Sequence, residues 1–267
     1  MILVKIGGGE HINTEYICED IATLVQNGEK IVIIHGANFV RDELAEKLNI
    51  PTKIITSPSG VASVFTDENA IDVFLMSYAG LVNKKLVARL LKYGVNAVGL
   101  SGVDGRLLQA KKRDAIYGVE NGKTKLITNS LTGKVEKVNG ELLNLLINAG
   151  YVPVLCPPAI SFENEILNID NDFASAIVAG ELGIEKIVML FEAPGILENV
   201  EDENTLIKNI KKEELGEYLK FAKGRMKKKI LGAEKSFALG VGQIYWGDGR
   251  IRNPIRNLLK GNGTIIE

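Results

Sequence analysis

Residues 2–9 read ILVKIGGG, an aliphatic run that is broken by three consecutive glycines. Branched aliphatic side chains favour a buried strand, and glycine ends it because its backbone turns without steric cost. Lys5 lies inside the apolar run, where burying an ammonium group is costly unless it reaches a partner or a ligand. We therefore expect a strand that ends at a binding site, with Lys5 pointing into that site.

The same alternation of apolar runs and amphipathic segments continues along the chain. Further buried strands are predicted at 30–35, 96–100, 151–155, 186–190 and 241–246, with a terminal strand at 263–267. Helical periodicity is found up to residue 28 and at 39–48, 67–93, 140–150, 172–183 and 227–239. Strands that are apolar throughout and separated by helices predict an α/β protein: a three-layer αβα sandwich around a mostly parallel sheet. Residues 105–136, charged and interrupted by glycine, predict hairpins.

Composition excludes several classes of protein. The 267 residues carry 32 Lys and Arg against 33 Asp and Glu, a net charge of -1, which argues against a nucleic-acid coat protein. No apolar run approaches the ~18 residues of a membrane span, and the apolar start is too short for a secretory signal. Cys18 and Cys156 stand alone, which predicts reduced thiols without a disulfide or a metal site. We expect a cytoplasmic protein.

Small residues gather where three predicted strands end. The segments are KIGGG (5–9), HGAN (35–38) and GLSGVDG (99–105). In open parallel sheets ligands bind at the carboxyl ends of strands, and backbone N–H groups there approach anions closely. Neither GxGxxG nor the GxxxxGK[ST] phosphate loop occurs. The pattern favours an anionic ligand held by a less common loop.

These motifs resemble those of the amino acid kinase family, in its acetylglutamate-kinase branch. VKIGGG (4–9), HGAN (35–38), LNIDND (167–172), GRMKKK (224–229) and GNGTII (261–266) occur in the order and spacing of that family, over the whole chain. The resemblance implies a carbamate-kinase-like fold in a single domain, 1–267. It further implies an acceptor-substrate lobe at about 1–170 and an ATP-binding lobe at 171–267. The implied co-substrate is ATP with Mg²⁺, held mainly by the nucleotide phosphates.

Four segments point more narrowly to one subgroup. TSPSG (56–60), TGKVEKVN (132–139), PPAIS (157–161) and GRMKKK are similar to the kinases that act on 2-aminoadipate or glutamate bound to a small amino-group carrier protein. That likeness implies acyl phosphate formation in lysine biosynthesis, or in arginine biosynthesis as well. It also implies a small acidic carrier as partner and a homodimer, to which the 67–93 helix could contribute.

The resemblance carries specific roles onto this chain. Lys5 and Lys229 would stabilise the transferring phosphoryl group, and Asp172 would orient both lysines. Substrate binding falls on Gly36, Ala37, Asn38, Val64 and Asn168, and ATP binding on Gly7, Gly8, Glu192, Gly195 and Met226, with Gly224 in the turn before Met226. No metal site on the protein is expected. Since successive helical residues are ~100° apart, Lys227 and Lys228 cannot share the direction of Lys229, and they would face solvent or the carrier.

Two departures from the family pattern concern the acceptor. HGAN replaces the three glycines that usually follow the histidine, and SVFT (63–66) replaces the usual SRYT. Val64 therefore stands where the family arginine grips the substrate carboxylate, and losing such a charged hydrogen bond typically costs ~1.5–3 kcal/mol. A carrier would add remote binding energy, which favours the carrier-linked acceptor. Kinases of free N-acetylglutamate and non-catalytic nucleotide or amino-acid sensors remain the alternatives.

Overall fold

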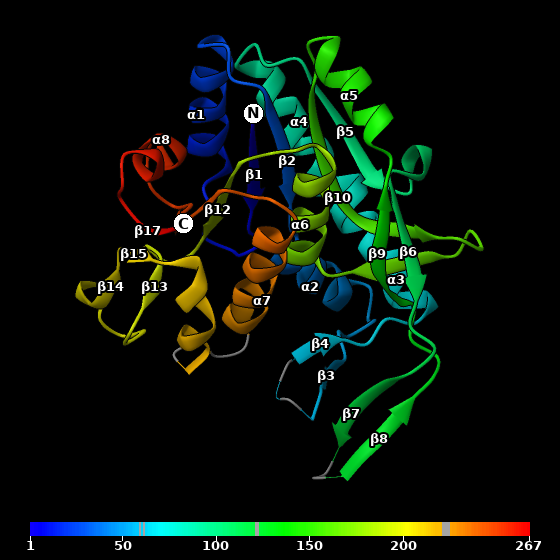
Figure 1. Ribbon diagram of the computed structural model, residues 1–267. Helices are drawn as coiled ribbons and strands as arrows, with labels where there is room; N and C mark the ends of the chain where they lie inside the picture. Colours follow the sequence, from blue (N-terminus) through cyan, green and yellow to red (C-terminus); the bar gives the residue numbers. More distant parts are fainter. Residues whose placement is uncertain (59, 61, 121–122, 221–224) are drawn as a thin grey trace.

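One large sheet forms the centre of the protein (Figure 1). The computed structural model describes residues 1–58, 60, 62–120, 123–220 and 225–267, and in these residues the sheet has 11 strands. Its longer parallel strands are β1 (Ile2–Ile6), β2 (Ile31–His35), β5 (Ala97–Gly102), β10 (Val152–Ser161), β12 (Lys186–Phe191) and β16 (Gln243–Asp248), of which β5 pairs with β10 alone. Neighbours among them pair in parallel, which confirms the predicted sheet.

Shorter strands complete the two edges of the sheet. One edge is formed by β6 (Leu108–Lys112), β9 (Thr132–Val138) and β11 (Ile166–Ile169), and the other by β17 (Thr264–Ile266) and β15 (Asn209–Ile210). Here antiparallel pairs appear, in β6–β9, β10–β11 and β16–β17. The sheet is thus mixed at its margins and parallel at its centre.

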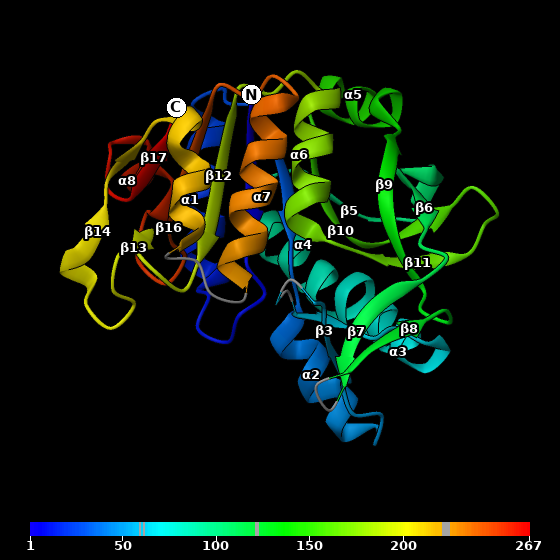
Figure 2. The same ribbon diagram turned by 60° about the horizontal axis from the view of Figure 1, so that its bottom comes forward.

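Helices cover both faces of the sheet, as the alternating pattern predicts. One face packs against α1 (Thr14–Gln26), α4 (Asn83–Lys92) and α8 (Pro254–Leu259). The opposite face packs against α5 (Gly140–Asn148), α6 (Asn171–Glu181) and α7 (Arg225–Ala238). Figure 2 shows α6 and α7 side by side over the sheet. The three-layer αβα sandwich is confirmed.

The alternation of side chains along strand β1 determines which face of the sheet carries Lys5. Val4 belongs to the core beneath α1, α4 and α8, whereas Leu3 belongs to the core beneath α5, α6 and α7. Because side chains alternate between faces, Lys5 lies on the same face as Leu3. It is also near the carboxyl end of the strand, where α6 and α7 begin.

The predicted 67–93 helix is one continuous helical segment with an irregular middle. It consists of α3 (Glu68–Phe74), a π-helical stretch (Leu75–Val82) and α4. Asp67 caps its start by accepting a hydrogen bond from the backbone N–H of Ala70 at 2.9 Å. In the described ranges, no helix, this one included, combines the length and the apolar character that crossing a membrane requires.

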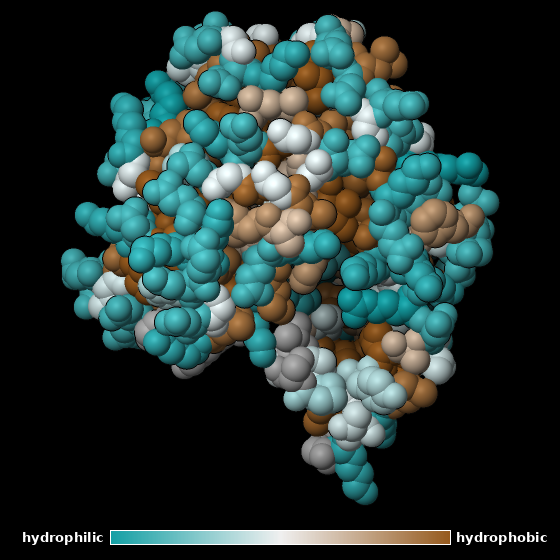
Figure 3. Space-filling view, in the orientation of Figure 1, coloured by the Kyte–Doolittle hydropathy of each residue, from teal (hydrophilic) through white to brown (hydrophobic). Residues whose placement is uncertain are grey.

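A small antiparallel sheet extends from the sandwich (Figures 1 and 3). It contains β3 (Ile54–Thr56), β4 (Ala62–Val64), β7 (Ile116–Glu120) and β8 (Lys123–Ile127), in the order β4-β3-β7-β8. The β7–β8 hairpin lies in the segment predicted to form hairpins. The β3–β4 hairpin was not predicted, because strands of three residues are too short to show a period of two.

The remaining elements surround the two ends of the sandwich. Helix α2 (Asn38–Lys47) follows β2 directly and confirms the predicted 39–48 helix. A two-stranded sheet joins β13 (Ile196–Leu197) to β14 (Leu206–Ile207), and short 3-10 helices occur at Asp104–Arg106, Glu203–Thr205 and Lys212–Lys220. Helix α2 is the element that bears on the site, because it begins where β2 ends.

Candidate active site

Three of the predicted residues meet in one buried cluster. Lys5 Nζ lies 2.6 Å from Asp172 Oδ1, and Lys229 Nζ lies 3.5 Å from Asp172 Oδ2. The side chains are only 7%, 12% and 11% exposed for Lys5, Lys229 and Asp172 respectively. Lys229 also lies over the ring of Phe191, 5.3 Å from its centroid. The sequence prediction that these three residues act together is consistent with this geometry.

Close packing of two helices makes the cluster possible. Gly232 lies three residues after Lys229, and a Cβ atom at Gly232 would be 3.1 Å from the Cβ of Asp172. A larger residue would push α7 away from the start of α6. Gly232 was not among the predicted site residues, although a glycine one helical turn after a candidate lysine is a signal of close helix approach.

Charge and burial together set the protonation of the cluster. Burial lowers the pKa of Lys229 to about 8, against the attraction of Asp172. Burial also opposes the charge of Lys5, but the contact with Asp172 is shorter and holds the pKa of Lys5 above its ordinary value. The pKa of Asp172 is lowered, because its two lysine neighbours outweigh the effect of burial. One carboxylate between two ammonium groups leaves a net positive charge for an anion.

The glycine turn after β1 packs directly against the turn after β2. A Cβ atom at Gly8 would lie 2.6 Å from the backbone N of Asn38 and would overlap Ala37 as well. The Gly8 carbonyl accepts a hydrogen bond from Phe39 N at 2.9 Å. Gly7 N–H and Gly36 N–H donate to sheet carbonyls, of Leu190 and Ile6, at 2.8 Å each. The N–H groups of Gly7 and Gly36 therefore continue the backbone hydrogen bonds of the sheet. The predicted binding of ATP by Gly7 and of the acceptor by Gly36 stays a prediction.

Buried polar contacts hold the turn after β2 in place. Asn83 Nδ2 donates to Val154 O at 2.9 Å and contacts His35 Nε2 at 3.1 Å. Burial lowers the pKa of His35 to about 4, so the imidazole is neutral and Nε2 accepts this hydrogen bond. Asn171, at the start of α6, donates to His35 O at 2.8 Å. Asn171 and Asn83 join three elements at the site, and the sequence prediction did not include them.

The residues predicted to bind the acceptor lie around the same turn. Ala37 precedes α2 and is buried, and Asn38 is the first residue of that helix. Asn168 in β11 donates from Nδ2 to Thr66 Oγ1 at 3.0 Å. Val64 in β4 packs on a cluster that includes Ala37. The structure thus brings Ala37, Val64 and Asn168 toward one region, and Thr66 is a further polar residue there that was not among the predicted site residues.

The residues predicted to bind ATP have different surroundings from one another. Glu192 follows β12 and is exposed, and its Oε1 accepts a hydrogen bond from His11 N at 2.6 Å. Gly195 is buried, and a Cβ atom there would be 3.0 Å from Thr264 N. Met226 lies in the first turn of α7 and packs on the core, whereas Gly224 lies outside the described residues. Glu192 and Gly195 thus have structural contacts of their own, and binding of ATP by these residues stays a prediction.

Lys228 does not have the surroundings that the sequence predicted for it. Its Nζ lies 3.1 Å from Ser63 Oγ and 3.4 Å from Asp170 Oδ2, and the side chain is 23% exposed. Asp170 in turn caps α6, accepting from the backbone N–H of Asp172 at 3.0 Å. The expectation that Lys228 faces solvent is therefore wrong, since its side chain connects α7 to β4 and to the start of α6. Contact of Lys228 with the carrier stays a prediction.

The protein residues of the site are suited to an anion more than to a metal ion. Within the described ranges, no three His, Cys, Asp or Glu side chains are grouped so that they could hold a metal. Helices α2, α6 and α7 all begin near the cluster, and helix N-termini favour negative charge. Together with Lys5 and Lys229, they form a surrounding that a nucleotide phosphate with its own Mg²⁺ would fit.

The chain is similar over most or all of its length to known proteins. Residues 1–245 match the model of the amino acid kinase family. The chain is 46% identical over 266 residues to a [LysW]-aminoadipate kinase of Deinococcus radiodurans, covering 100% of this chain and 91% of that protein. It is 45% identical over 268 residues to a [LysW]-aminoadipate kinase of Thermus thermophilus, covering 100% of both chains.

A solved structure shows the same fold at lower identity. The protein smu.665 from Streptococcus mutans UA159 superimposes with a TM-score of 0.78 at 23% identity, covering 99% of this chain and 97% of the other. The family match over residues 1–245 and the two relatives that align with the full chain lead to one conclusion. The chain belongs to the amino acid kinase family.

Proposed function

We propose that this protein transfers the γ-phosphoryl group of ATP to the side-chain carboxylate of 2-aminoadipate, or of glutamate, bound to a small acidic LysW-type carrier protein. The product is an acyl phosphate, in lysine biosynthesis, or in lysine and arginine biosynthesis, in the cytoplasm. The observation that carries this proposal is the buried cluster of Lys5, Asp172 and Lys229. The names of the two relatives support the choice of acceptor.

The reaction requires positive charge and positioning rather than a general base. The attacking carboxylate is already ionised at neutral pH. Its oxygen forms a bond to the γ-phosphorus while the bond from that phosphorus to the β,γ-bridging oxygen breaks, and ADP leaves. Charge develops on the phosphoryl oxygens and on the leaving oxygen. We assign Lys5 to the phosphoryl group and Lys229 to the nucleotide side, with Asp172 positioning both ammonium groups.

Trapping of the acyl phosphate tests the proposal. Hydroxylamine converts an acyl phosphate to a hydroxamate, and the assay is run with carrier-linked 2-aminoadipate, carrier-linked glutamate and free N-acetylglutamate. We expect hydroxamate with a carrier-linked acceptor and its loss in Lys5→Ala. Turnover of free N-acetylglutamate alone would show an acetylglutamate kinase instead. Nucleotide binding without hydroxamate from any acceptor would show a sensor.

We also propose a homodimer that uses the long helix from α3 to α4. Met76 and Leu81 on its π-helical stretch are large apolar side chains that are 44% and 40% exposed, and a dimer contact would bury them. Sedimentation of the native chain should give a dimer, and Met76→Lys with Leu81→Lys should give a monomer. A native monomer at micromolar concentration contradicts this part of the proposal.

A further inference from the structure

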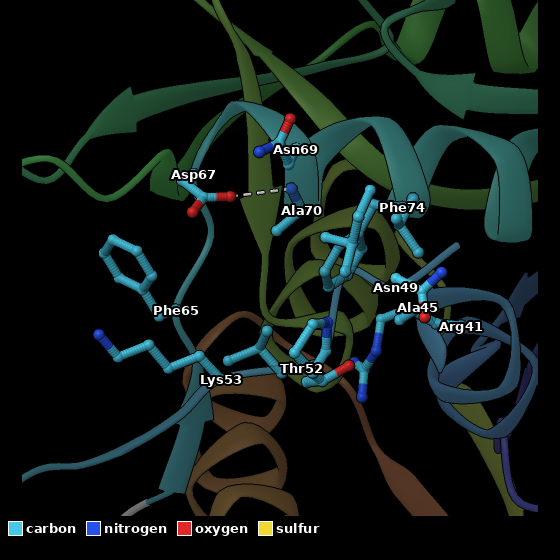
Figure 4. Close-up of a pocket in the computed structure, with 14 residues that line it drawn as sticks. Arg41, Ala45, Asn49, Thr52, Lys53, Phe65, Asp67, Asn69, Ala70 and Phe74 are labelled. Carbon is cyan, nitrogen blue, oxygen red and sulfur yellow. Dashed lines mark hydrogen bonds between the residues drawn. The ribbon is translucent and has the colours of Figure 1, made fainter. Parts of the chain in front are cut away.

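A pocket of about 290 Å³ lies beside the predicted acceptor site (Figure 4). Its lining residues come from α2, from the loop that leads to β3, from β4, from the connection between β4 and α3, and from α3. Val64 and Arg41 both line this pocket. Val64 occupies the position where the family resemblance leads us to expect an arginine that binds the carboxylate. A different cation, Arg41, lines the pocket next to position 64.

Contacts on one edge orient the Arg41 guanidinium. The Arg41 side chain is 7% exposed, and its Nε and Nη2 lie 3.0 and 2.6 Å from Asp42 Oδ1. Thr52 Oγ1 donates to the same carboxylate oxygen at 2.7 Å. Since the ion pair uses Nε and Nη2, the two N–H groups of Nη1 take no part in it. Arg41 is thus a buried cation with a fixed orientation and further donor capacity.

Aromatic packing connects this guanidinium to the predicted acceptor turn. Arg41 lies over the ring of Phe74, 5.3 Å from its centroid, and Phe74 stacks on Tyr78 at 5.1 Å. Phe74 and Tyr78 share a buried cluster with Ala37, and Val64 packs on that cluster. The pKa of Tyr78 lies above its ordinary value because the side chain is buried. The charge of Arg41, a hydrogen bond from the Ala37 backbone and the charge of Lys5 offset part of this increase. Tyr78 is therefore within electrostatic reach of both cations.

An acceptor with two carboxylates suits this arrangement. One carboxylate is phosphorylated and must approach Lys5, while the other stays ionised and needs a partner of its own. Position 64 offers only a valine, whereas Arg41 presents a guanidinium in the adjoining pocket. A guanidinium binds carboxylates through parallel N–H donors, which gives orientation as well as affinity.

We propose that Arg41 binds the acceptor carboxylate that is not phosphorylated, in place of the arginine that the family has at position 64. The proposal rests on the proposed function, because it assumes a dicarboxylic acceptor. Arg41 is then a specificity-determining residue, and Asp42 and Thr52 position its guanidinium.

Steady-state kinetics with the carrier-linked acceptor provide the first test. Arg41→Met should raise the KM for this acceptor about 10- to 100-fold, because a charged hydrogen bond is lost. The KM for ATP and the kcat should stay close to native values, since the contact is the same in ground and transition states. The matched control is Lys53→Met, which removes another cation of the pocket; Lys53 is exposed, so its effect should be below about fivefold.

Two further experiments do not depend on how well Arg41→Met folds. The native chain should strongly prefer the acceptor over the same molecule with its free carboxylate converted to an amide. The double variant Arg41→Val with Val64→Arg should recover at least part of the acceptor affinity lost in Arg41→Val, because the cation returns to the same pocket. Equal use of acid and amide by the native chain overturns the proposal, as does a double variant no better than Arg41→Val.

Failure of this proposal can be told apart from failure of the proposed function. If the native chain forms no acyl phosphate with any acceptor, the proposed function is wrong. If the native chain is active and Arg41→Met has an unchanged acceptor KM, only the role of Arg41 is wrong.

Discussion

The ammonium group of Lys228 lies 3.1 Å from the hydroxyl of Ser63, although the two residues are 165 positions apart. Lys228 lies in the first turn of α7, and Ser63 lies in β4 next to Val64. The same ammonium group is 3.4 Å from Asp170, which caps the helix that carries Asp172. One side chain thus connects the β3–β4 hairpin to the cluster that we assign to phosphoryl transfer.

We expect Lys228→Met and Ser63→Ala to be non-additive. Each variant removes one partner of the same contact, so a double-mutant cycle should give a coupling energy of about 0.5–1.5 kcal/mol. Urea unfolding of the native chain, the two single variants and the double variant measures this coupling energy. The matched control is the cycle of Lys235→Met, on the same helix, with Ser63→Ala, which should show additive effects. Additive effects of Lys228→Met and Ser63→Ala would show that the contact does not contribute in solution.

Removing Asp172 should be more damaging than removing its whole ion pair with Lys5. Asp172→Ala leaves two buried ammonium groups without a counter-charge, and breaking a buried pair in this way costs about 3–5 kcal/mol. We expect Asp172→Ala to have the lower free energy of unfolding, and Lys5→Met with Asp172→Ala to recover part of the loss. Chemical denaturation compares the two. Equal stability of the single and double variants would contradict the proposed charge balance.

The activity should fall at alkaline pH because of Lys229. Its pKa is lowered to about 8, so its ammonium group loses a proton as the pH rises through that value. The acceptor kcat/KM reports ionisations of the free enzyme, and it should decrease about tenfold per pH unit above this pKa. Lys229→Arg keeps its charge, so any activity it retains should not fall in this range. A flat native profile from pH 7.5 to 9.5 would exclude Lys229 as the required cation.

Gly8→Ala should disrupt the two turns that meet at the site. The added methyl group would overlap the backbone at Ala37 and Asn38, which cannot move as freely as a side chain. We expect a loss of about 1–3 kcal/mol in stability and a large loss of activity. Gly80→Ala is the control, because its Cβ would meet only Leu75 O at an ordinary 3.6 Å. Native activity in Gly8→Ala would show that the turns after β1 and β2 can move apart without loss of function.

Much of the fold could be predicted from local patterns. The strand that contains Lys5, the parallel sheet and the helices on both faces follow from apolar runs and helical periodicity within windows of five to about twenty residues. The short strands β3, β4, β13 and β14 were not predicted, since two or three residues carry no measurable period. The cluster of Lys5, Asp172 and Lys229 was found through the family resemblance, and Gly232, which lets α7 approach it, was not.

The sequence by itself determined where strands and helices end, because these ends depend on neighbouring residues. It therefore also determined which charged residues lie at those ends. Only the tertiary structure decided which of these charges meet. Lys228 has partners in β4 and before α6, and Arg41 on α2 is buried and lines the same pocket as Val64. Such contacts join segments that are distant in the chain, so they depend on the packing of the whole sandwich and leave no local pattern from which to read them.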